Sequence, residues 1–233
     1  MAVKSVYLPV PVFEHDLLHI KEEEHRHLMV ARAERGEPVE IFDGQGNVWN
    51  AIVVEIRRRE TVVEINSSRF VEGDPFEVTL GLAWIRSAAF ELALEKAVEI
   101  GVSRIVPLAA SRSNVPHSRN RDRSSRIIIE AAKQAKRYHL PVLEETVAFD
   151  EIVTMQATSK IMLAEHHGGP LKSALFGSPV LYLVGPEGGW TEAEIDMAEH
   201  HGFCAVSLGR GILRAETAAI VGGAIIRYEI ASR

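Results

Sequence analysis

The sequence contains a single cysteine, Cys204, and no apolar run long enough to span a membrane. One thiol cannot close a disulfide within the chain or provide a cysteine-based zinc site, so both are excluded. The longest apolar run, residues 218–226, is interrupted by glycines and is much shorter than the roughly 18 residues that suggest a transmembrane helix. The first residues carry prolines and acids where a signal peptide needs an unbroken apolar segment. We therefore expect a soluble, cytoplasmic protein with no membrane partner.

Three motifs that carry common chemistries are also missing. No phosphate loop ends in Gly-Lys-Ser/Thr, no Gly-x-Gly-x-x-Gly follows a strand, and no His-Glu-x-x-His occurs. A nicotinamide-dependent oxidoreductase is therefore a weak interpretation. The histidines form adjacent pairs, His166-His167 and His200-His201, whose side chains point apart on a strand or a helix. We predict no metal site.

The charge is unevenly distributed along the chain. Acidic residues outnumber basic ones, 32 to 26, and the net charge of -6 argues mildly against nucleic acid, which proteins hold by neutralising phosphates. Between positions 112 and 137, however, there are eight basic residues and only two acidic ones, Asp122 and Glu130. This island is either a solvated loop or an anion-binding surface. Its members are Arg112, Arg119, Arg121, Arg123, Arg126, Lys133, Lys136 and Arg137.

Hydrophobic residues make up 46% and charged residues 25% of the chain, an ordinary globular balance that excludes disorder. Residues 1–72 are rich in short Val, Ile and Thr runs joined by turn residues, which predicts a small β-rich domain. A linker near residues 71–75 leads into the rest of the chain. The elements expected in the first domain are a helix over 22–35 and strands over 39–43, 48–56 and 61–66.

Residues 73–233 alternate short apolar strands with helices, which predicts an α/β domain with a mostly parallel sheet. Gly101 is a helix stop, and Thr191 with Glu194 forms a capping box that opens another helix. The expected strands cover residues 78–83, 104–108, 160–164, 180–184 and 205–208, and two of the expected helices cover 124–138 and 216–230.

The final expected helix, residues 216–230, is apolar on nearly every side. Gly222 and Gly223 each lower helix stability by about 1 kcal/mol relative to alanine. Burial on more than one side would offset this cost. Core packing and a dimer interface are both compatible with the pattern.

Two strands run directly into glycine-containing loops that precede helices. Glycines let backbone amides approach a bound molecule closely, and open α/β sheets bind ligands at the carboxyl ends of their strands. On these grounds alone each loop is either a ligand site or a tight turn. The loops read Gly185-Pro186-Glu187-Gly188-Gly189-Trp190 and Leu208-Gly209-Arg210-Gly211-Ile212-Leu213-Arg214-Ala215-Glu216-Thr217.

Together the two loops resemble the RsmE family of ribosomal RNA methyltransferases in the SPOUT superfamily. The resemblance extends over nearly the whole chain, through residues 94–102, the helix with Lys133 and Gln134, and the histidine-rich segment from His25. The sequence departs from the family pattern at two places. Near the N-terminus Lys4 stands where the family usually has an arginine beside aromatic residues, and Arg86 stands where the family tends to carry a lysine.

The resemblance implies a SPOUT-type trefoil-knotted domain over residues 73–233, preceded by a small PUA-like β-barrel domain over 1–72. It implies methyl transfer from S-adenosylmethionine to N3 of a uridine in small-subunit (16S) ribosomal RNA by a homodimer, whose substrate is either the free RNA or the small ribosomal subunit. The implied cofactor-binding residues are Leu183, Gly185, Pro186, Glu187, Gly188, Gly189, Leu208, Gly209, Arg210, Ile212 and Leu213.

The uridine N3 proton must leave during methyl transfer, which favours a nearby base or a cation that stabilises the anion. The catalytic candidates are Arg214 as the cation and Glu216 or Glu187 as the base. For Glu216, charge complementarity at the start of a helix is an equal alternative. The RNA-binding candidates are Arg112, Arg119, Arg121, Arg123, Arg126, Arg137, His27 and Arg32.

Two other functions remain open from the sequence. The first is a different SPOUT methyltransferase that acts on the ribose 2′-oxygen of RNA, because that group shares the loops in looser form. The second is a non-catalytic RNA-binding or assembly protein that uses the β-rich domain and the basic island. The intact glycine loops argue against the second interpretation.

Overall fold

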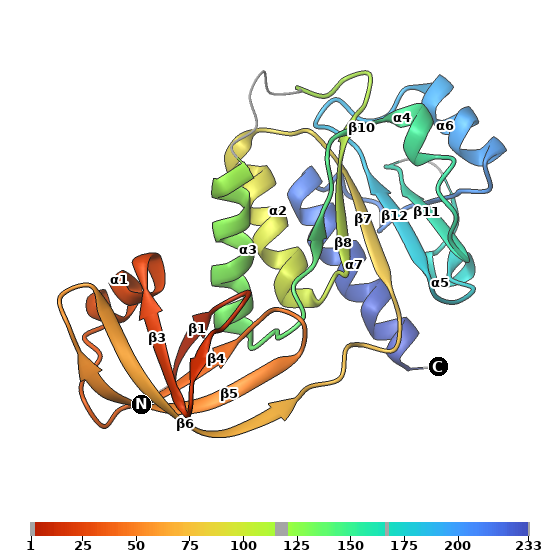
Figure 1. Cartoon of the computed structure of the whole chain (residues 1–233). Coiled ribbons are helices and arrows are strands. Elements are labelled where there is room, and N and C mark those ends of the chain that lie inside the picture. The colour runs from red at the N-terminus through yellow and green to blue at the C-terminus, as the bar shows by residue number, and fades with distance from the viewer. Residues whose placement is uncertain (1–2, 115–120, 166–167, 233) are drawn as a thin grey trace. The chain divides into compact units, whose positions relative to one another are not determined.

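The chain folds into two compact units, which the computed structural model describes over residues 3–114, 121–165 and 168–232. The first unit contains Met1–Gly73 together with Ala132–Leu140, and the second contains Asp74–Ala131 together with Pro141–Arg233. Figure 1 shows both units, with helix α3 (Arg121–Ala135) beginning in the second unit and ending among residues of the first. The histidine pair at 166–167 and the RNA-binding candidate Arg119 lie outside the described residues.

The first unit contains a six-stranded sheet in the order β1-β4-β5-β6-β3-β2. The β1–β4 pair is parallel and the other neighbours are antiparallel. Its core is formed by fully buried aliphatic side chains, among them Leu18, Ile20 and Ile41. The strands are β1 (Lys4–Tyr7), β2 (Phe13–Glu14), β3 (Leu17–Lys21), β4 (Pro38–Phe42), β5 (Asn47–Ile56) and β6 (Glu60–Phe70), and helix α1 covers Glu22–Val30.

Helix α1 ends five residues before the predicted boundary at 35. Arg32 adopts a left-handed φ of 50°, which ends the helical path. The backbone N–H of Ala33 then donates to the carbonyl of Leu28 at 2.9 Å, which satisfies one of the last helix carbonyls. The prediction for this helix end was therefore wrong because a local backbone turn replaced the last helical residues.

Residues Ala132–Leu140 join the first unit through a buried carboxylate on β4. Glu40 is 8% exposed and accepts hydrogen bonds from Lys136 Nζ at 2.8 Å and from Arg69 Nη2 and Tyr138 Oη at 3.0 Å. Burial alone would raise the pKa of Glu40, but these hydrogen bonds outweigh it and lower the pKa below its ordinary value. A buried charge with three donors is stable, and it fixes this segment against β4.

The second unit is built on a sheet whose strands are all parallel, so the predicted mostly parallel α/β sheet is confirmed. The order β10-β8-β7-β12-β11-β13, with β9 beside β8, places β7 and β12 at the centre. The strands are β7 (Val78–Ala83), β8 (Arg104–Ala109), β9 (Val142–Leu143), β10 (Val147–Ala148), β11 (Ser159–Leu163), β12 (Val180–Val184) and β13 (Cys204–Val206).

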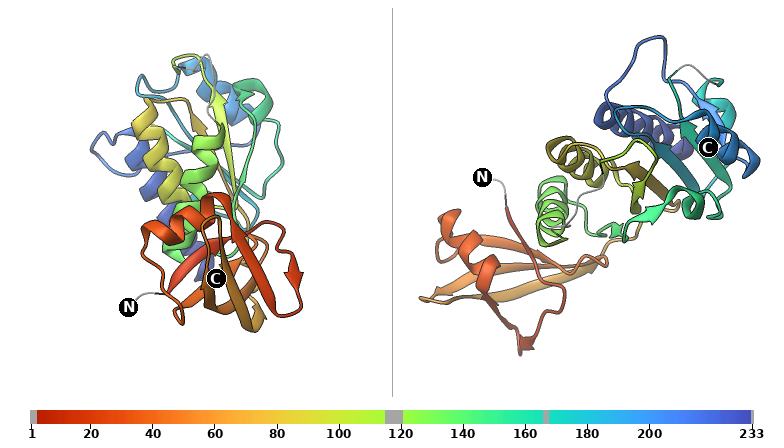
Figure 2. Two further views of the ribbon diagram at one scale, coloured as in Figure 1. Left: turned by 60° about the vertical axis from the view of Figure 1, so that its left-hand side comes forward. Right: turned by 90° about the horizontal axis from the view of Figure 1, so that it is seen from above.

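Helices cover both faces of this sheet, as Figure 2 shows in its right-hand view. On one face, α4 and α6 close a core around Leu181, Leu183 and Ile195. On the other face, α7 packs on β7, β12 and α2. The helices of this unit, apart from α3, are α2 (Ser87–Ile100), α4 (Phe149–Ile152), α5 (Leu171–Ala174), α6 (Glu192–His200) and α7 (Ala215–Ala231). None of the helices within the described residues is long and apolar enough to cross a bilayer.

The two glycines of α7 lie where the helix approaches the sheet most closely. A Cβ on Gly222 would lie 2.7 Å from Leu163 Cδ1, and one on Gly223 would lie 2.6 Å from Tyr182 Oη. Tyr182 is fully buried and donates to the Ala219 carbonyl at 3.2 Å. Glycine therefore permits close contact on this face. Within the described residues the opposite side of α7 is not covered, because Val221, Ile225 and Tyr228 are exposed.

Candidate active site

A cavity of about 900 Å³ lies in the second unit, at the carboxyl ends of its parallel strands. Both glycine-containing loops line it, and so do the first residues of α2 and α7. Ten of the predicted cofactor-binding and catalytic residues are brought together here, namely Gly185, Pro186, Glu187, Gly188, Gly189, Leu208, Ile212, Leu213, Arg214 and Glu216. Three predicted cofactor residues, Leu183, Gly209 and Arg210, do not line the cavity; Leu183 is buried in the sheet core.

The loop at residues 185–190 folds into a tight turn after β12. The N–H of Gly189 donates to the Pro186 carbonyl at 2.9 Å, and Gly189 has a φ of 68°, a conformation that favours glycine. A Cβ on Gly185 would lie 3.0 Å from the Trp190 ring. The indole of Trp190 in turn donates to the Leu163 carbonyl at 2.9 Å, which ties the loop to the end of β11.

Glu187 connects the same loop to α2. Its Oε1 accepts a hydrogen bond from the backbone N–H of Arg86 at 3.0 Å, and Arg86 is the N-cap residue of α2. A helix N-terminus leaves backbone donors unpaired and carries partial positive charge, so it attracts a carboxylate. One oxygen of this candidate base is therefore engaged in holding the loop.

Arg112 lines the cavity from the turn that follows β8. Its Nη1 donates to the carbonyls of Gly188 at 2.8 Å and Trp190 at 3.3 Å. A Cβ on Gly188 would lie 3.3 Å from the Cβ and Cδ atoms of Arg112, so the side chain packs directly on the loop. The residue predicted to bind RNA therefore lies against the glycine loop.

The second loop, residues 207–214, follows β13 and leads into α7. Ser207 Oγ donates to the Gly209 carbonyl at 2.9 Å, and Gly209 has a φ of 130°. Arg214 is the N-cap residue of α7, and Glu216 lies in its first turn. Ile212 is 68% exposed although it is apolar, which leaves its side chain available to a bound molecule.

Several cavity residues were not among the predicted site residues. Arg86 follows β7, Glu165 follows β11, and Trp190 closes the first loop. The signal that would have found Arg86 and Glu165 is their position just after apolar strands, because the carboxyl ends of parallel strands meet at one edge of a sheet. Others include Ala88, Ala89, Leu92, Leu163, Ala164 and Ser207.

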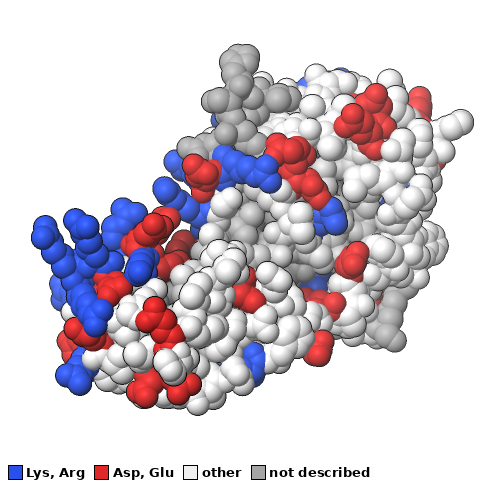
Figure 3. Space-filling view, viewed as in Figure 1, with Lys and Arg blue, Asp and Glu red and all other residues white. Residues whose placement is uncertain are grey.

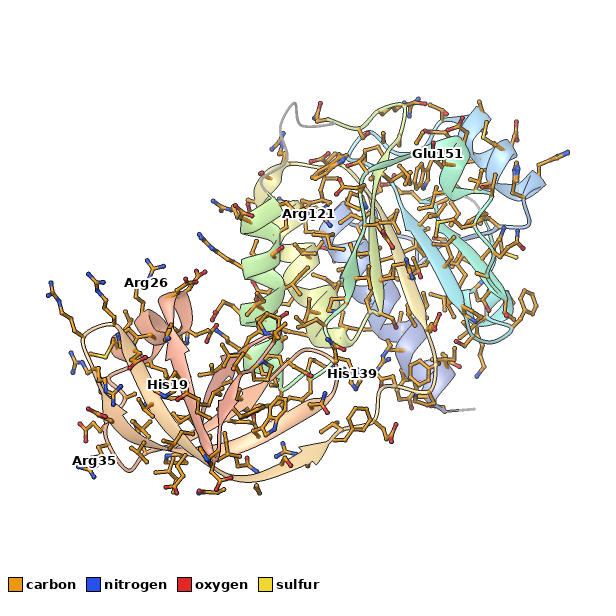
Figure 4. All side chains as sticks on the ribbon, in the orientation of Figure 1. His19, Arg26, Arg35, Arg121, His139 and Glu151 are labelled. Carbon is orange, nitrogen blue, oxygen red and sulfur yellow. The ribbon has the colours of Figure 1, made fainter. Side chains whose placement is uncertain are left out.

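The other RNA-binding candidates that fall within the described residues do not line the cavity. At the start of α3, labelled in Figure 4, Arg121 forms an ion pair with Glu145, and Arg123 Nε lies 2.6 Å from Glu91 Oε1. Arg126 is exposed on the same helix, and Arg137 is half-buried beyond its end. In the first unit, His27 is half-buried on α1 and Arg32 is exposed just after it.

Comparisons with known proteins agree on one family. The family described as "RNA methyltransferase domain" matches residues 72–227. The chain is 32% identical to ribosomal RNA small subunit methyltransferase E of Synechocystis, over 95% of this chain and 76% of that protein. It is also 26% identical to the protein of the same name from Rickettsia conorii, over 97% of this chain and 96% of that one.

Solved structures give the same result. The Neisseria gonorrhoeae ribosomal RNA small subunit methyltransferase E, bound to S-adenosyl methionine, has a TM-score of 0.90 and 27% identity, covering 97% of this chain and 98% of that one. A putative methyltransferase of Legionella pneumophila in complex with the same cofactor has a TM-score of 0.91 and 28% identity, with 98% of each chain covered. The chain belongs to the ribosomal RNA small subunit methyltransferase E family.

Proposed function

We propose that this protein transfers the methyl group of S-adenosylmethionine to N3 of a uridine in small-subunit (16S) ribosomal RNA. The observation that carries the proposal is the cavity at the strand ends, where two glycine loops meet in a chain of this family. Its relatives are named for action on that RNA, and two similar structures hold the cofactor.

The residues around the cavity fit S-adenosylmethionine. Its volume of about 900 Å³ lies within the range of small-molecule sites, and Val184, Val206 and Leu208 provide apolar surface for an adenine ring. The acidic residue Glu165 is available to hydroxyl or ammonium groups of the cofactor.

The chain's own residues have limited chemistry to perform. When bound, S-adenosylmethionine would supply a methyl group on a sulfonium. N3 of the uridine would attack the methyl carbon in line as the N3 proton leaves, the carbon–sulfur bond would break, and the sulfur would depart as a neutral thioether. Holding the two reactants in this geometry contributes about 7 to 11 kcal/mol. We assign Arg214 to stabilising the developing uridine anion and Glu216 to accepting the proton. Glu187, whose carboxylate is held by Arg86 N–H, is the less favoured base.

We assign RNA binding to basic side chains in both units. Arg121, Arg123 and Arg126 lie on α3, where a phosphate would compete with the carboxylates that pair with the first two. In Figure 3 basic side chains gather over α1 and the turn between β5 and β6. The exposed arginines of the first unit include Arg26, Arg32, Arg35, Arg58 and Arg59. We also propose that residues 1–72 form a PUA-like β-barrel domain and that the protein is located in the cytoplasm.

The exposed face of α7 supports a homodimer. Val221, Ile225 and Tyr228 are 36%, 37% and 74% exposed, and together they form an apolar stripe on one helix. Monomers seldom leave such stripes uncovered, and a second copy of the chain is the partner we propose. We include the trefoil knot of the SPOUT superfamily in the same proposal.

The test uses small ribosomal subunits from cells that lack this gene, incubated with the pure protein and labelled S-adenosylmethionine. Nucleosides are then separated and identified by mass spectrometry, with free ribosomal RNA run in parallel. Label in 3-methyluridine is expected. Label in a 2′-O-methyl nucleoside would contradict the assigned position, and RNA binding without cofactor binding would contradict the enzyme assignment.

A further inference from the structure

Arg112 projects from a backbone turn that is held on several sides. Ser113 N–H donates to the Ala110 carbonyl at 3.1 Å, and Ser113 Oγ accepts from Ala110 N–H at 2.9 Å. Asn114 N–H donates to the Trp84 carbonyl at 3.3 Å. The turn that follows β8 is therefore ordered, and it fixes the position from which the Arg112 side chain extends.

A buried carboxylate fixes the same turn to the region that follows the glycine loop. Glu194 is 5% exposed, and its Oε1 accepts from Ser111 N–H at 2.8 Å. Its Oε2 accepts from Thr191 N–H at 2.8 Å and from Thr191 Oγ1 at 3.0 Å. One carboxylate thus joins the residue before Arg112 to the residue directly after the 185–190 loop.

The Arg112 guanidinium binds the 185–190 loop directly. Its Nη1 donates to the carbonyls of both Gly188 and Trp190, at two points of the 185–190 loop. These carbonyls belong to neither a helix nor a strand, so no ladder of backbone hydrogen bonds fixes them. A charged donor forms shorter and stronger hydrogen bonds than a neutral one, which suits it to holding a loop rich in glycine.

We propose that Arg112 is a positioning residue that holds the 185–190 loop in its cofactor-binding conformation through the carbonyls of Gly188 and Trp190. The inference rests on the proposed function, because it takes S-adenosylmethionine as the ligand of that loop. It replaces the RNA-contact role that the basic island suggested for Arg112. Arg121 and Arg123 differ in kind, because each pairs with a carboxylate outside the cavity.

The experiment measures the dissociation constant of S-adenosylmethionine by titration calorimetry, without RNA, for wild type and three variants. Arg112→Ala removes both hydrogen bonds, and we expect the constant to rise about tenfold. Arg112→Lys keeps a charged donor without the planar fork, and we expect an intermediate rise. Arg104→Ala is the matched control, because Arg104 is an exposed arginine at the other end of β8 that pairs with Glu144; its constant stays at the wild-type value.

Binding of small subunits that lack the modification is measured on the same variants. We expect Arg112→Ala to bind them as wild type does, and its thermal unfolding midpoint to stay close to that of wild type, because the side chain is exposed. Unchanged cofactor affinity together with weaker subunit binding would overturn the inference and restore the RNA-contact role. A wild-type protein that binds no S-adenosylmethionine would overturn the proposed function as well, so the two failures are distinguishable.

Discussion

The carboxylate of Glu187 accepts a hydrogen bond at 3.0 Å from the backbone N–H of Arg86, although 101 positions separate the two residues in the chain. The contact joins the loop after β12 to the N-terminus of α2, which follows β7 along the chain. Strands β7 and β12 are neighbours in the sheet. It gives Glu187 a structural role that competes with a role as proton acceptor. Substitutions distinguish the two roles.

Glu187→Gln keeps a side-chain oxygen that can accept the hydrogen bond from the Arg86 N–H, whereas Glu187→Ala removes this oxygen. We expect the Gln variant to retain most of the methyl-transfer rate and the Ala variant to bind S-adenosylmethionine more weakly, by about five- to tenfold. Single-turnover rates and calorimetric affinities measure the two quantities separately. A rate for Glu187→Gln that falls by about a hundredfold or more would identify Glu187 as the base instead.

Arg214 and Glu216 are expected to affect the rate more than cofactor binding. Arg214→Ala should lower kcat by about 100- to 1000-fold, because it removes the charge to which we assign stabilisation of the developing anion. Glu216→Gln should lower it by a similar factor if its carboxylate accepts the proton. Arg214→Lys, which keeps the charge, is the control. Full activity of Arg214→Ala at unchanged cofactor affinity would show that the assignment is wrong.

Gly223→Ala should destabilise the protein although alanine is the better helix former. In an unobstructed helix the change stabilises by about 1 kcal/mol, but here the new Cβ would lie 2.6 Å from the buried Tyr182 hydroxyl oxygen. We expect a net loss of about 1 to 3 kcal/mol in the free energy of unfolding, measured with denaturant. Ala224→Ser, at the next and exposed position of α7, should change it by less than about 0.5 kcal/mol. Stabilisation by Gly223→Ala would contradict the close packing.

Ile225→Glu should convert the proposed dimer to monomers, because it places a charge in the apolar stripe of α7. Met197→Glu on α6 is the matched control, since Met197 is 39% exposed and Ile225 is 37% exposed. Light scattering coupled to size exclusion gives the mass of each variant. A control that also dissociates, or an Ile225→Glu variant that remains dimeric, would be inconsistent with an interface on α7.

The buried carboxylate of Glu194 should make stability depend on pH. Burial raises the pKa of this group, but hydrogen bonds from Ser111 and Thr191 outweigh burial, and the pKa in the folded protein lies below its ordinary value. The ionised group therefore stabilises the fold above the unfolded-state pKa, about 4.3, and this contribution disappears as the pH falls through the lowered folded-state pKa.

Glu194→Gln should accordingly cost about 1 to 3 kcal/mol at neutral pH, and the difference from wild type should shrink as the pH falls below about 4. Denaturant unfolding at several pH values measures it. Glu192→Gln, at an exposed acid in the same helical turn, serves as the control and should change stability little. A cost of Glu194→Gln that is constant with pH would show that the carboxylate charge contributes nothing.

Much of the local structure was predictable from the sequence. Strands β7 and β12 have the predicted boundaries, because short apolar runs between turn residues are strong signals. The capping box of Thr191 and Glu194 occurs as predicted, since both partners lie within one helical turn. The two glycine loops, the parallel sheet and the family also followed from residues that are close together in the chain.

Tertiary structure decided which distant residues meet. Strands pair through backbone hydrogen bonds, which depend little on side-chain identity. No local sequence pattern therefore predicted that β7 and β11 would lie on either side of β12. That order brings Arg86 and the Leu163 carbonyl to the 185–190 loop, and it places Arg112 against Gly188 rather than in a free basic loop. The sequence determined the elements and the loop chemistry, whereas the packing of the strands determined the partners that hold the loop.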